Sequence, residues 1–190
     1  LFGGGGISNV ATTKVEAYNT SLVRTIPTAL SQARVQAGTT TINNYALFGL
    51  ADCYRGMNQQ LKSIEYWNKI LEIDPRNKVI LTRAGDAFRT TGNYDEAISY
   101  YTKALEIDFD IYAAIGLALI CKCQGKYEEA VERFQTLIRN DPRNSRLYVD
   151  LAECYSMMNK KDEAIKILEN YLSNDGKNIQ IRNLLERLKK

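Results

Sequence analysis

The feature that most constrains this chain is a short tract that returns at a nearly fixed interval. Asp74-Pro75-Arg76-Asn77 and Asp141-Pro142-Arg143-Asn144 are the same four residues, and Asp108 and Asp175 stand between and beyond them. The successive intervals between the four aspartates are 34, 33 and 34 residues. Self-similarity at this period is typical of helical-repeat arrays, in which each unit buries its apolar face against its neighbours. The sequence therefore predicts an all-α fold built from stacked helical units.

Within each period the apolar residues recur at helical spacing, and two amphipathic helices fit. In the clearest period Leu81, Ala84 and Phe88 share one face. Gly92 then ends the helix, because glycine adopts the left-handed backbone that a helix C-terminus favours. We expect the side chain of Asn93 to cap the following helix. Where Gly92 stands, the other periods have Gly125, Asn58 and Asn159, and asparagine also tolerates this conformation.

The small and large residues at fixed positions of each period resemble the pattern of the tetratricopeptide repeat family. Four registers agree, over residues 44–77, 78–110, 111–144 and 145–178. The second carries the pattern most fully, in Leu81, Ala84, Gly85, Phe88, Gly92, Tyr94, Ala97, Tyr101 and Ala104. It is one residue short, because Phe109 replaces the proline of the pattern and Asp110 leads directly into Ile111. The resemblance implies an α-α superhelix, a right-handed solenoid of helix-turn-helix repeats.

The two ends of the chain lie outside these registers. Residues 1–9 are a glycine-rich lead that we expect to be flexible, and residues 10–43 are predicted to be a helical segment with the spacing of a degenerate repeat. The elements expected in this segment are helices over 10–24 and 27–37, a stop at Gly38, and a linker of Thr39-Thr40-Thr41. Residues 179–190 have apolar residues at helical spacing, and we expect them to cap the last repeat.

The composition argues against several classes of function. The chain has no histidine, which removes the usual general base and the commonest metal ligand. We find no catalytic constellation, so we predict neither an enzyme nor a bound cofactor or metal. The net charge of +3 comes from 25 basic and 22 acidic residues without a basic run, so nucleic acid is not implied as a partner. No apolar run approaches the ~20 residues that span a bilayer, so direct membrane insertion is not expected.

The four cysteines are Cys53, Cys121, Cys123 and Cys154. Residues two apart in a helix, such as Cys121 and Cys123, point to different sides, which disfavours a shared metal ion. We therefore interpret all four as small apolar core residues. Free thiols weakly favour a reducing, cytoplasmic compartment. The chain starts at Leu1, so we expect a fragment or a processed product, and a periplasmic or membrane-anchored protein stays open.

Members of the resembled family line a concave groove with the first helix of each repeat. Carried over position by position, the predicted groove residues are Phe48, Asp52, Arg55, Thr82, Asp86, Arg89, Tyr112, Ile115, Leu119, Lys122, Val149, Glu153 and Met157. The acidic residues Asp52, Asp86 and Glu153 occupy one position of the first helices, and the basic residues Arg55, Arg89 and Lys122 occupy the position three residues later. The third repeat adds an apolar centre formed by Tyr112, Ile115 and Leu119. Two interpretations stay open. The charges are i, i+3 pairs on a solvated surface, or they set the register of a peptide anchored on the apolar centre.

One subclass of the family can be tested against these residues. Members that hold the acidic C-terminal tails of heat-shock chaperones use lysine, arginine and asparagine at five groove positions. In this chain, the two registers that could carry such a clamp have Asp52 and Asp86 at an asparagine position. This departure argues against a receptor for chaperone tails.

The leading prediction of function is a non-enzymatic adaptor or scaffold that binds a protein or peptide in the groove. The alternatives are a structural homo-oligomer assembled through residues 8–37, and the non-catalytic part of a larger enzyme or membrane-anchored complex. The shortened step after Asp108 coincides with the apolar centre of the third repeat. We expect the most unusual feature of the groove at that place.

Overall fold

The computed structural model describes residues 39–189, which form α-helices joined by short turns. The chain divides into two compact units, residues 1–49 and 50–190. The described part of the first unit is the beginning of α2 (Thr39–Gly56), a helix that continues into the second unit. The predictions made for residues 1–38 lie outside the described residues: the flexible lead, the helices over 10–24 and 27–37, and the oligomerisation segment 8–37.

The linker predicted at Thr39-Thr40-Thr41 is wrong, because α2 begins at Thr39. Threonine is a mediocre helix former, but its cost is below about 1 kcal/mol per residue. Neither glycine nor proline interrupts the chain from Thr39 to Phe48. Once a helix has nucleated, extending it by one turn costs little. The helix that buries Leu50 and Ala51 therefore continues through the threonines.

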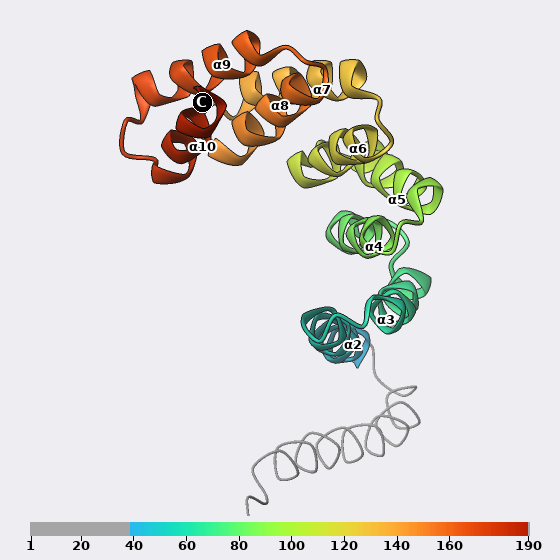
Figure 1. Cartoon of the computed structure of the whole chain (residues 1–190). Coiled ribbons are helices and arrows are strands. Elements are labelled where there is room, and N and C mark those ends of the chain that lie inside the picture. The colour runs from blue at the N-terminus through green and yellow to red at the C-terminus, as the bar shows by residue number, and fades with distance from the viewer. Residues whose placement is uncertain (1–38, 190) are drawn as a thin grey trace, which may run out of the picture. The chain divides into compact units, whose positions relative to one another are not determined.

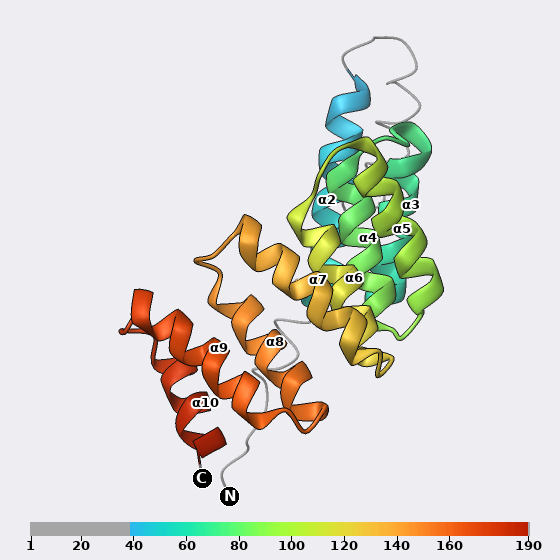
Figure 2. The same ribbon diagram turned by 90° about the horizontal axis from the view of Figure 1, so that it is seen from above.

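The second unit is an array of helices in sequence order, and from α3 onwards each packs against the next (Figure 1). Its complete helices are α3 (Gln60–Ile73), α4 (Lys78–Thr90), α5 (Tyr94–Ile107), α6 (Ile111–Cys123), α7 (Tyr127–Asn140), α8 (Ser145–Met157), α9 (Lys161–Asn174) and α10 (Ile179–Lys189). Packing also reaches beyond the next helix, from α4 to α6 and from α8 to α10. The second view shows α4, α5 and α6 grouped together (Figure 2).

Four turns, each inside one helical pair, share the same backbone geometry. The left-handed residues are Asn58 (φ 59°), Gly92 (φ 82°), Gly125 (φ 75°) and Asn159 (φ 58°). In each turn the next N–H donates to the carbonyl five residues earlier, as Lys126 N does to Cys121 O at 2.9 Å. This is the Schellman arrangement of a helix C-terminus. The prediction that these four positions end helices in the left-handed conformation is confirmed.

The prediction that the Asn93 side chain caps α5 is wrong, because it accepts no hydrogen bond from the helix. Asn93 has φ −82° and ψ 74°, which differs from the extended backbone of a capping residue because it directly follows a left-handed residue. Side-chain caps are found instead at the first helices of two pairs. Asn77 Oδ1 accepts from Ile80 N at 3.2 Å, and Asp110 Oδ1 accepts from Tyr112 N at 2.8 Å.

The core of the second unit is a series of clusters shared between neighbouring helices. One cluster joins α4, α5 and α6, another joins α6, α7 and α8, and a third joins α8, α9 and α10. Ala97 on α5 and Ala130 on α7 are fully buried, and their small size lets the helices approach closely. Tyr101 and Phe134, also fully buried, fill the space beside them. Each pair therefore depends on its neighbours for burial, as expected of stacked repeats.

Helix α10 lies beside α8 and α9 (Figure 1). Its apolar stripe covers this last pair. Ile181 and Leu185 are buried, and Leu184 and Leu188 pack beside them against residues of α8 and α9. The side chain of Asn178 caps the helix, accepting a hydrogen bond from Ile181 N at 3.1 Å. The residues after the last pair thus form a helix whose apolar face is matched to that pair.

Candidate functional site

Three charged clusters lie along the first helices of the pairs, and the first is centred on Asp52 near the end of α2. Asp52 Oδ1 accepts hydrogen bonds from Arg55 Nε at 3.0 Å and from Arg83 Nη1 at 2.8 Å. The Arg83 guanidinium, on α4, also lies over the ring of Trp67, 5.8 Å from its centroid. Trp67 is a fully buried residue of α3. Arg83 therefore links side chains of three helices.

The second cluster joins α4 to α5. The hydroxyl of Tyr101 donates a hydrogen bond to Asp86 Oδ1 at 2.6 Å and accepts one from Arg89 Nε at 3.3 Å. Arg89 Nη2 also lies 3.6 Å from Asp86 Oδ1. Burial, together with the Asp86 carboxylate, raises the pKa of Tyr101 far above its ordinary value of 10.0. The phenol therefore remains a hydrogen-bond donor to Asp86 over a wider pH range than an ordinary tyrosine would.

The third cluster joins α6 to α8. Lys122 Nζ donates to Asp150 Oδ1 at 2.6 Å and to Glu153 Oε2 at 2.5 Å. Burial disfavours the charged form of Lys122, but these hydrogen bonds outweigh it and raise the pKa of Lys122 above its ordinary value of 10.5. Asp150 is 7% exposed, and its Oδ2 has no hydrogen-bond partner among the described residues. Arg146 Nε, at 3.8 Å from that oxygen, is beyond hydrogen-bond distance.

These contacts pair the acidic and basic residues that the sequence places at two positions of the first helices. Asp52 with Arg55 and Asp86 with Arg89 are the i, i+3 pairs of the first interpretation. The links from Asp52 to α4 and from Lys122 to α8 run between helices and were not predicted. The charges of this surface are therefore largely neutralised within the protein.

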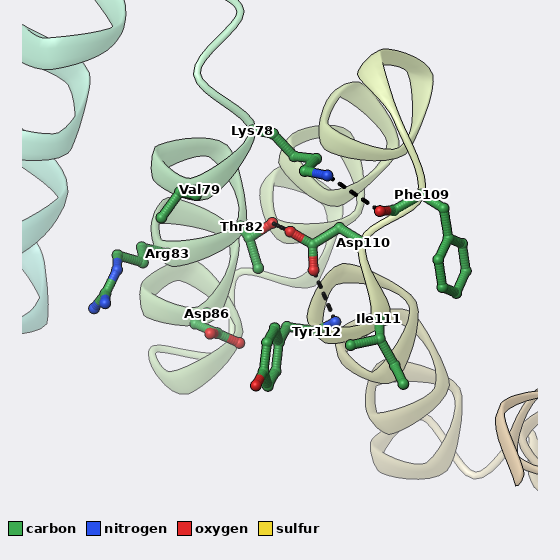
Figure 3. A pocket seen from close by; sticks show the side chains of 9 residues that line it. All are labelled: Lys78, Val79, Thr82, Arg83, Asp86, Phe109, Asp110, Ile111 and Tyr112. Carbon is green, nitrogen blue, oxygen red and sulfur yellow. Dashed lines mark hydrogen bonds between the residues drawn. The ribbon is translucent and has the colours of Figure 1, made fainter. Parts of the chain in front are cut away.

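A pocket of about 590 Å³ opens beside the first two clusters, between α4 and the beginning of α6 (Figure 3). Its lining residues are Lys78, Val79, Thr82, Arg83, Asp86, Phe109, Asp110, Ile111 and Tyr112. Apolar side chains are exposed around it: Val79 is 52%, Phe109 55% and Tyr112 71% exposed. The pocket thus combines free apolar surface with charged groups that are already paired.

Polar contacts hold the two walls of the pocket together. The Thr82 hydroxyl on α4 donates to Asp110 Oδ2 at 3.1 Å, while Asp110 Oδ1 caps α6 (Figure 3). Lys78 Nζ donates to Asp108 Oδ2 at 2.9 Å and to the Phe109 carbonyl at 3.2 Å. The turn that carries these acceptors contains the step that is one residue short. The pocket therefore lies at the place where the sequence led us to expect the most unusual feature.

The remaining predicted groove residues are dispersed. Leu119 is 9% exposed and packs in the cluster of α6, α7 and α8, so its prediction as a surface anchor is wrong. The physical reason is that α6 is apolar on almost all sides and is covered on more than one face. Ile115 and Val149 are half-buried against two different clusters, and Met157 is 62% exposed at the end of α8. Phe48 is half-buried and belongs to the first unit.

Several residues of the site were missed by sequence reasoning. Arg83 and Asp150 are each the sixth residue of their repeat. In family members with the chaperone clamp this position contacts the ligand, so the family pattern could have pointed to both residues. The shortened step pointed to Phe109 and Asp110. Nothing in the sequence indicated a role for the Tyr101 hydroxyl, because the family pattern expects an aromatic core residue at that position.

The cysteines divide into two classes. Cys121 and Cys154 are buried, whereas Cys53 and Cys123 are exposed, so the prediction that all four are core residues is wrong for the latter two. Helical periodicity is the reason, since residues two apart face different sides. Across residues 39–189 no group of three or more metal-ligating side chains comes together. In the same range no helix has the length and apolarity needed to cross a membrane.

Comparison with known proteins identifies the family. Three tetratricopeptide repeat models match residues 45–77, 80–111 and 124–188, which together cover more than half of the chain. The chain therefore belongs to the tetratricopeptide repeat family, and its fold is an all-α helical-repeat solenoid. Proteins of this family act as scaffolds for protein–protein interaction.

Relatives and solved structures agree with this assignment. DnaJ homolog subfamily C member 3 from Gallus gallus is 26% identical over 176 residues, which are 84% of this chain and 35% of that protein. The chain thus spans about a third of that relative. MamA from Desulfovibrio magneticus has the same fold, with a TM-score of 0.66 at 14% identity, over 77% of this chain and 83% of that one. PilF from Pseudomonas aeruginosa has a TM-score of 0.66 at 22% identity, over 78% of this chain and 68% of that one.

Proposed function

We propose that this chain is a non-catalytic adaptor that binds an extended peptide or a protein segment on the surface formed by α4, α6 and α8. The single observation that carries the proposal is the pocket between α4 and α6, where Val79, Phe109 and Tyr112 leave apolar side chains exposed. Exposed apolar residues gathered around a concavity are typical of sites for protein partners.

The charges around the pocket indicate which part of a partner provides affinity. Asp86 and Arg83 already have partners within the protein, at 2.6 Å from Tyr101 and 2.8 Å from Asp52 respectively. A partner charge would have to compete with these contacts, so it gains little net free energy. Apolar burial against Val79 and Tyr112 meets no such competition. We therefore propose an apolar anchor side chain in the pocket, with the charge clusters on α4, α6 and α8 fixing orientation.

The proposal is tested with peptides selected on the wild-type protein from a random display library. Val79→Lys and Tyr112→Ser alter exposed side chains of the pocket rim and should leave the fold intact. Leu61→Lys is the matched control, because Leu61 is an exposed apolar residue of α3 outside this pocket.

We expect the selected peptides to bind at least tenfold more weakly to both rim variants and unchanged to Leu61→Lys, since a central anchor contributes ~2 kcal/mol or more. Affinity that is equal for wild type and both rim variants would place the binding site elsewhere. Circular dichroism of each variant confirms that the comparison is made between folded proteins.

A further inference from the structure

Tyr101 belongs to α5, the second helix of its pair, yet its hydroxyl contacts two side chains of the first helix. The residue is 0% exposed and packs in the cluster shared by α4, α5 and α6. A buried tyrosine hydroxyl needs a hydrogen-bond partner, and here it has both an acceptor, Asp86, and a donor, Arg89. A side chain without exposed surface therefore touches two charged residues of the binding surface.

Two glycines allow the Tyr101 ring to reach this position. A Cβ atom at Gly85, on α4, would lie 2.7 Å from Tyr101 Cε1. A Cβ atom at Gly116, on α6, would lie 2.6 Å from the Tyr101 hydroxyl oxygen. Both distances are far below the ~3.5–4.0 Å of favourable non-bonded contact, so any larger residue at either of these two positions would displace the ring. The path of the phenol from α5 to Asp86 thus depends on both neighbouring helices.

The neighbouring pairs show what is particular to Tyr101. The residues 34 positions before and 33 positions after it are Trp67 and Phe134, both fully buried. Neither has a hydroxyl group. Of these three residues, Tyr101 is the one that can hydrogen-bond both members of an i, i+3 ion pair on the preceding helix. That pair is also the one whose carboxylate lines the pocket.

We infer that Tyr101 is a positioning residue for the binding surface, because its hydroxyl fixes the rotamers of Asp86 and Arg89 beside the pocket. The inference rests on the proposed function, since it gives Tyr101 a part in partner recognition at the same place. An ion pair on the surface of a helix holds its side chains weakly by itself. The hydroxyl adds a buried anchor to that pair, so a partner meets side chains that are already ordered and loses less conformational entropy on binding.

The test uses two tyrosines that are adjacent in the sequence. Tyr101→Phe keeps the ring between Gly85 and Gly116 but removes the hydroxyl. Tyr100→Phe is the matched control, since the Tyr100 hydroxyl donates to Asn68 Oδ1 at 2.7 Å and does not contact the charged pair. Both variants are made in the full chain, and thermal unfolding establishes that each is folded.

The first measurement needs no partner. In ¹⁵N-labelled protein the Arg89 Nε–H signal reports the hydrogen bond to the phenol oxygen. We expect slow exchange of this proton with water in wild type and in Tyr100→Phe, and exchange at least tenfold faster in Tyr101→Phe. Equal exchange rates in all three proteins would overturn the inference, whatever the protein binds. A change of packing alone would not single out this one guanidinium proton.

The second measurement uses a peptide selected by display on the wild-type protein and compares its binding to wild type, Val79→Lys, Tyr101→Phe and Tyr100→Phe. We expect Tyr101→Phe to weaken its binding about tenfold, as for loss of a hydrogen bond to a charged group, and Tyr100→Phe to leave it unchanged. Unchanged binding in Tyr101→Phe, with Val79→Lys still weakened, would overturn the role in recognition and leave the proposed function standing. Failure of the proposed function is seen separately, as unchanged binding in Val79→Lys.

Discussion

Lys122 on α6 donates a hydrogen bond of 2.6 Å to Asp150 on α8, and both side chains are mostly removed from solvent. The contact joins two helices that are not consecutive in the sequence. It also supplies the counter-charge of a carboxylate that is 7% exposed and has an oxygen without a hydrogen bond among the described residues. Lys122 therefore compensates a buried negative charge and is not simply a solvated surface lysine.

The first prediction follows from that relationship. Lys122→Met should lower the free energy of unfolding by about 2–3 kcal/mol, because it leaves the buried Asp150 carboxylate without a lysine hydrogen bond and with the Arg146 guanidinium, at 3.8 Å, as its remaining counter-charge. Urea denaturation measures the loss, and Lys126→Met, at an exposed lysine after the same helix, is the control.

Adding Asp150→Leu to Lys122→Met should recover most of that loss, because the buried carboxylate is then gone. A double variant that is no more stable than Lys122→Met would contradict this account of the pair. So would a single variant with the stability of the Lys126→Met control.

The second prediction concerns the left-handed turn at Gly92. Gly92→Val should destabilise the protein by about 1–2 kcal/mol, because a β-branched residue is strained at φ 82°. A Cβ atom at this position would meet no atom within 4 Å, so the cost comes from the backbone alone. Gly92→Asn is the matched variant and should cost less, since Asn58 and Asn159 hold the same conformation. Equal thermal stabilities for the valine and asparagine variants would refute this.

The third prediction concerns the close packing within pairs. Ala97→Leu and Ala130→Leu should each lower stability by about 1–3 kcal/mol, because both alanines are fully buried and the added methyl groups have no free space. Thr102→Leu, an exposed position on the same helix as Ala97, should change stability little. Differential scanning calorimetry compares the three. No loss in either alanine variant would show that these positions do not set the helix spacing.

The fourth prediction concerns thiol chemistry. Cys53 and Cys123 are exposed and should react with iodoacetamide in the folded protein, whereas Cys121 and Cys154 should react only after denaturation. Burial raises the pKa of Cys154 to about 11, so few thiolates form there below that pH and raising the pH from 7 to 9 should not expose it to the reagent. Mass spectrometry of digested protein locates each adduct. Rapid labelling of Cys154 at neutral pH would contradict the packing of α8.

Much of the fold follows from the sequence because the relevant constraints are local. Helical periodicity and the four left-handed turn positions were readable from residues such as Gly92 and Asn159. The prediction of a side-chain cap at Asn93 was wrong because the preceding turn, rather than the residue type, sets the backbone angles of Asn93. The prediction of a linker at Thr39-Thr40-Thr41 was wrong because the low helix propensity of threonine costs little when an existing helix is extended by one turn.

The site was less predictable because its contacts depend on which helices come together. Asp52 and Lys122 each pair with a residue about 30 positions away, on a different helix. Leu119 resembled a surface anchor by its position, yet it is buried in the cluster shared by α6, α7 and α8. The buried Tyr101 hydroxyl reaches Asp86 and Arg89 only because Gly85 and Gly116 leave room for the ring, a condition that involves three helices at once.

The most direct test of the central claim, that the surface around the pocket binds the partner, is methyl NMR of the ¹³C-labelled protein titrated with a display-selected peptide. We expect the methyl signals of Val79 and Ile111, which line the pocket, to shift with the peptide concentration. Those of Ile165 and Ile179, on α9 and α10, should stay in place. Shifts confined to α9 and α10, with the pocket signals unmoved, would contradict this claim.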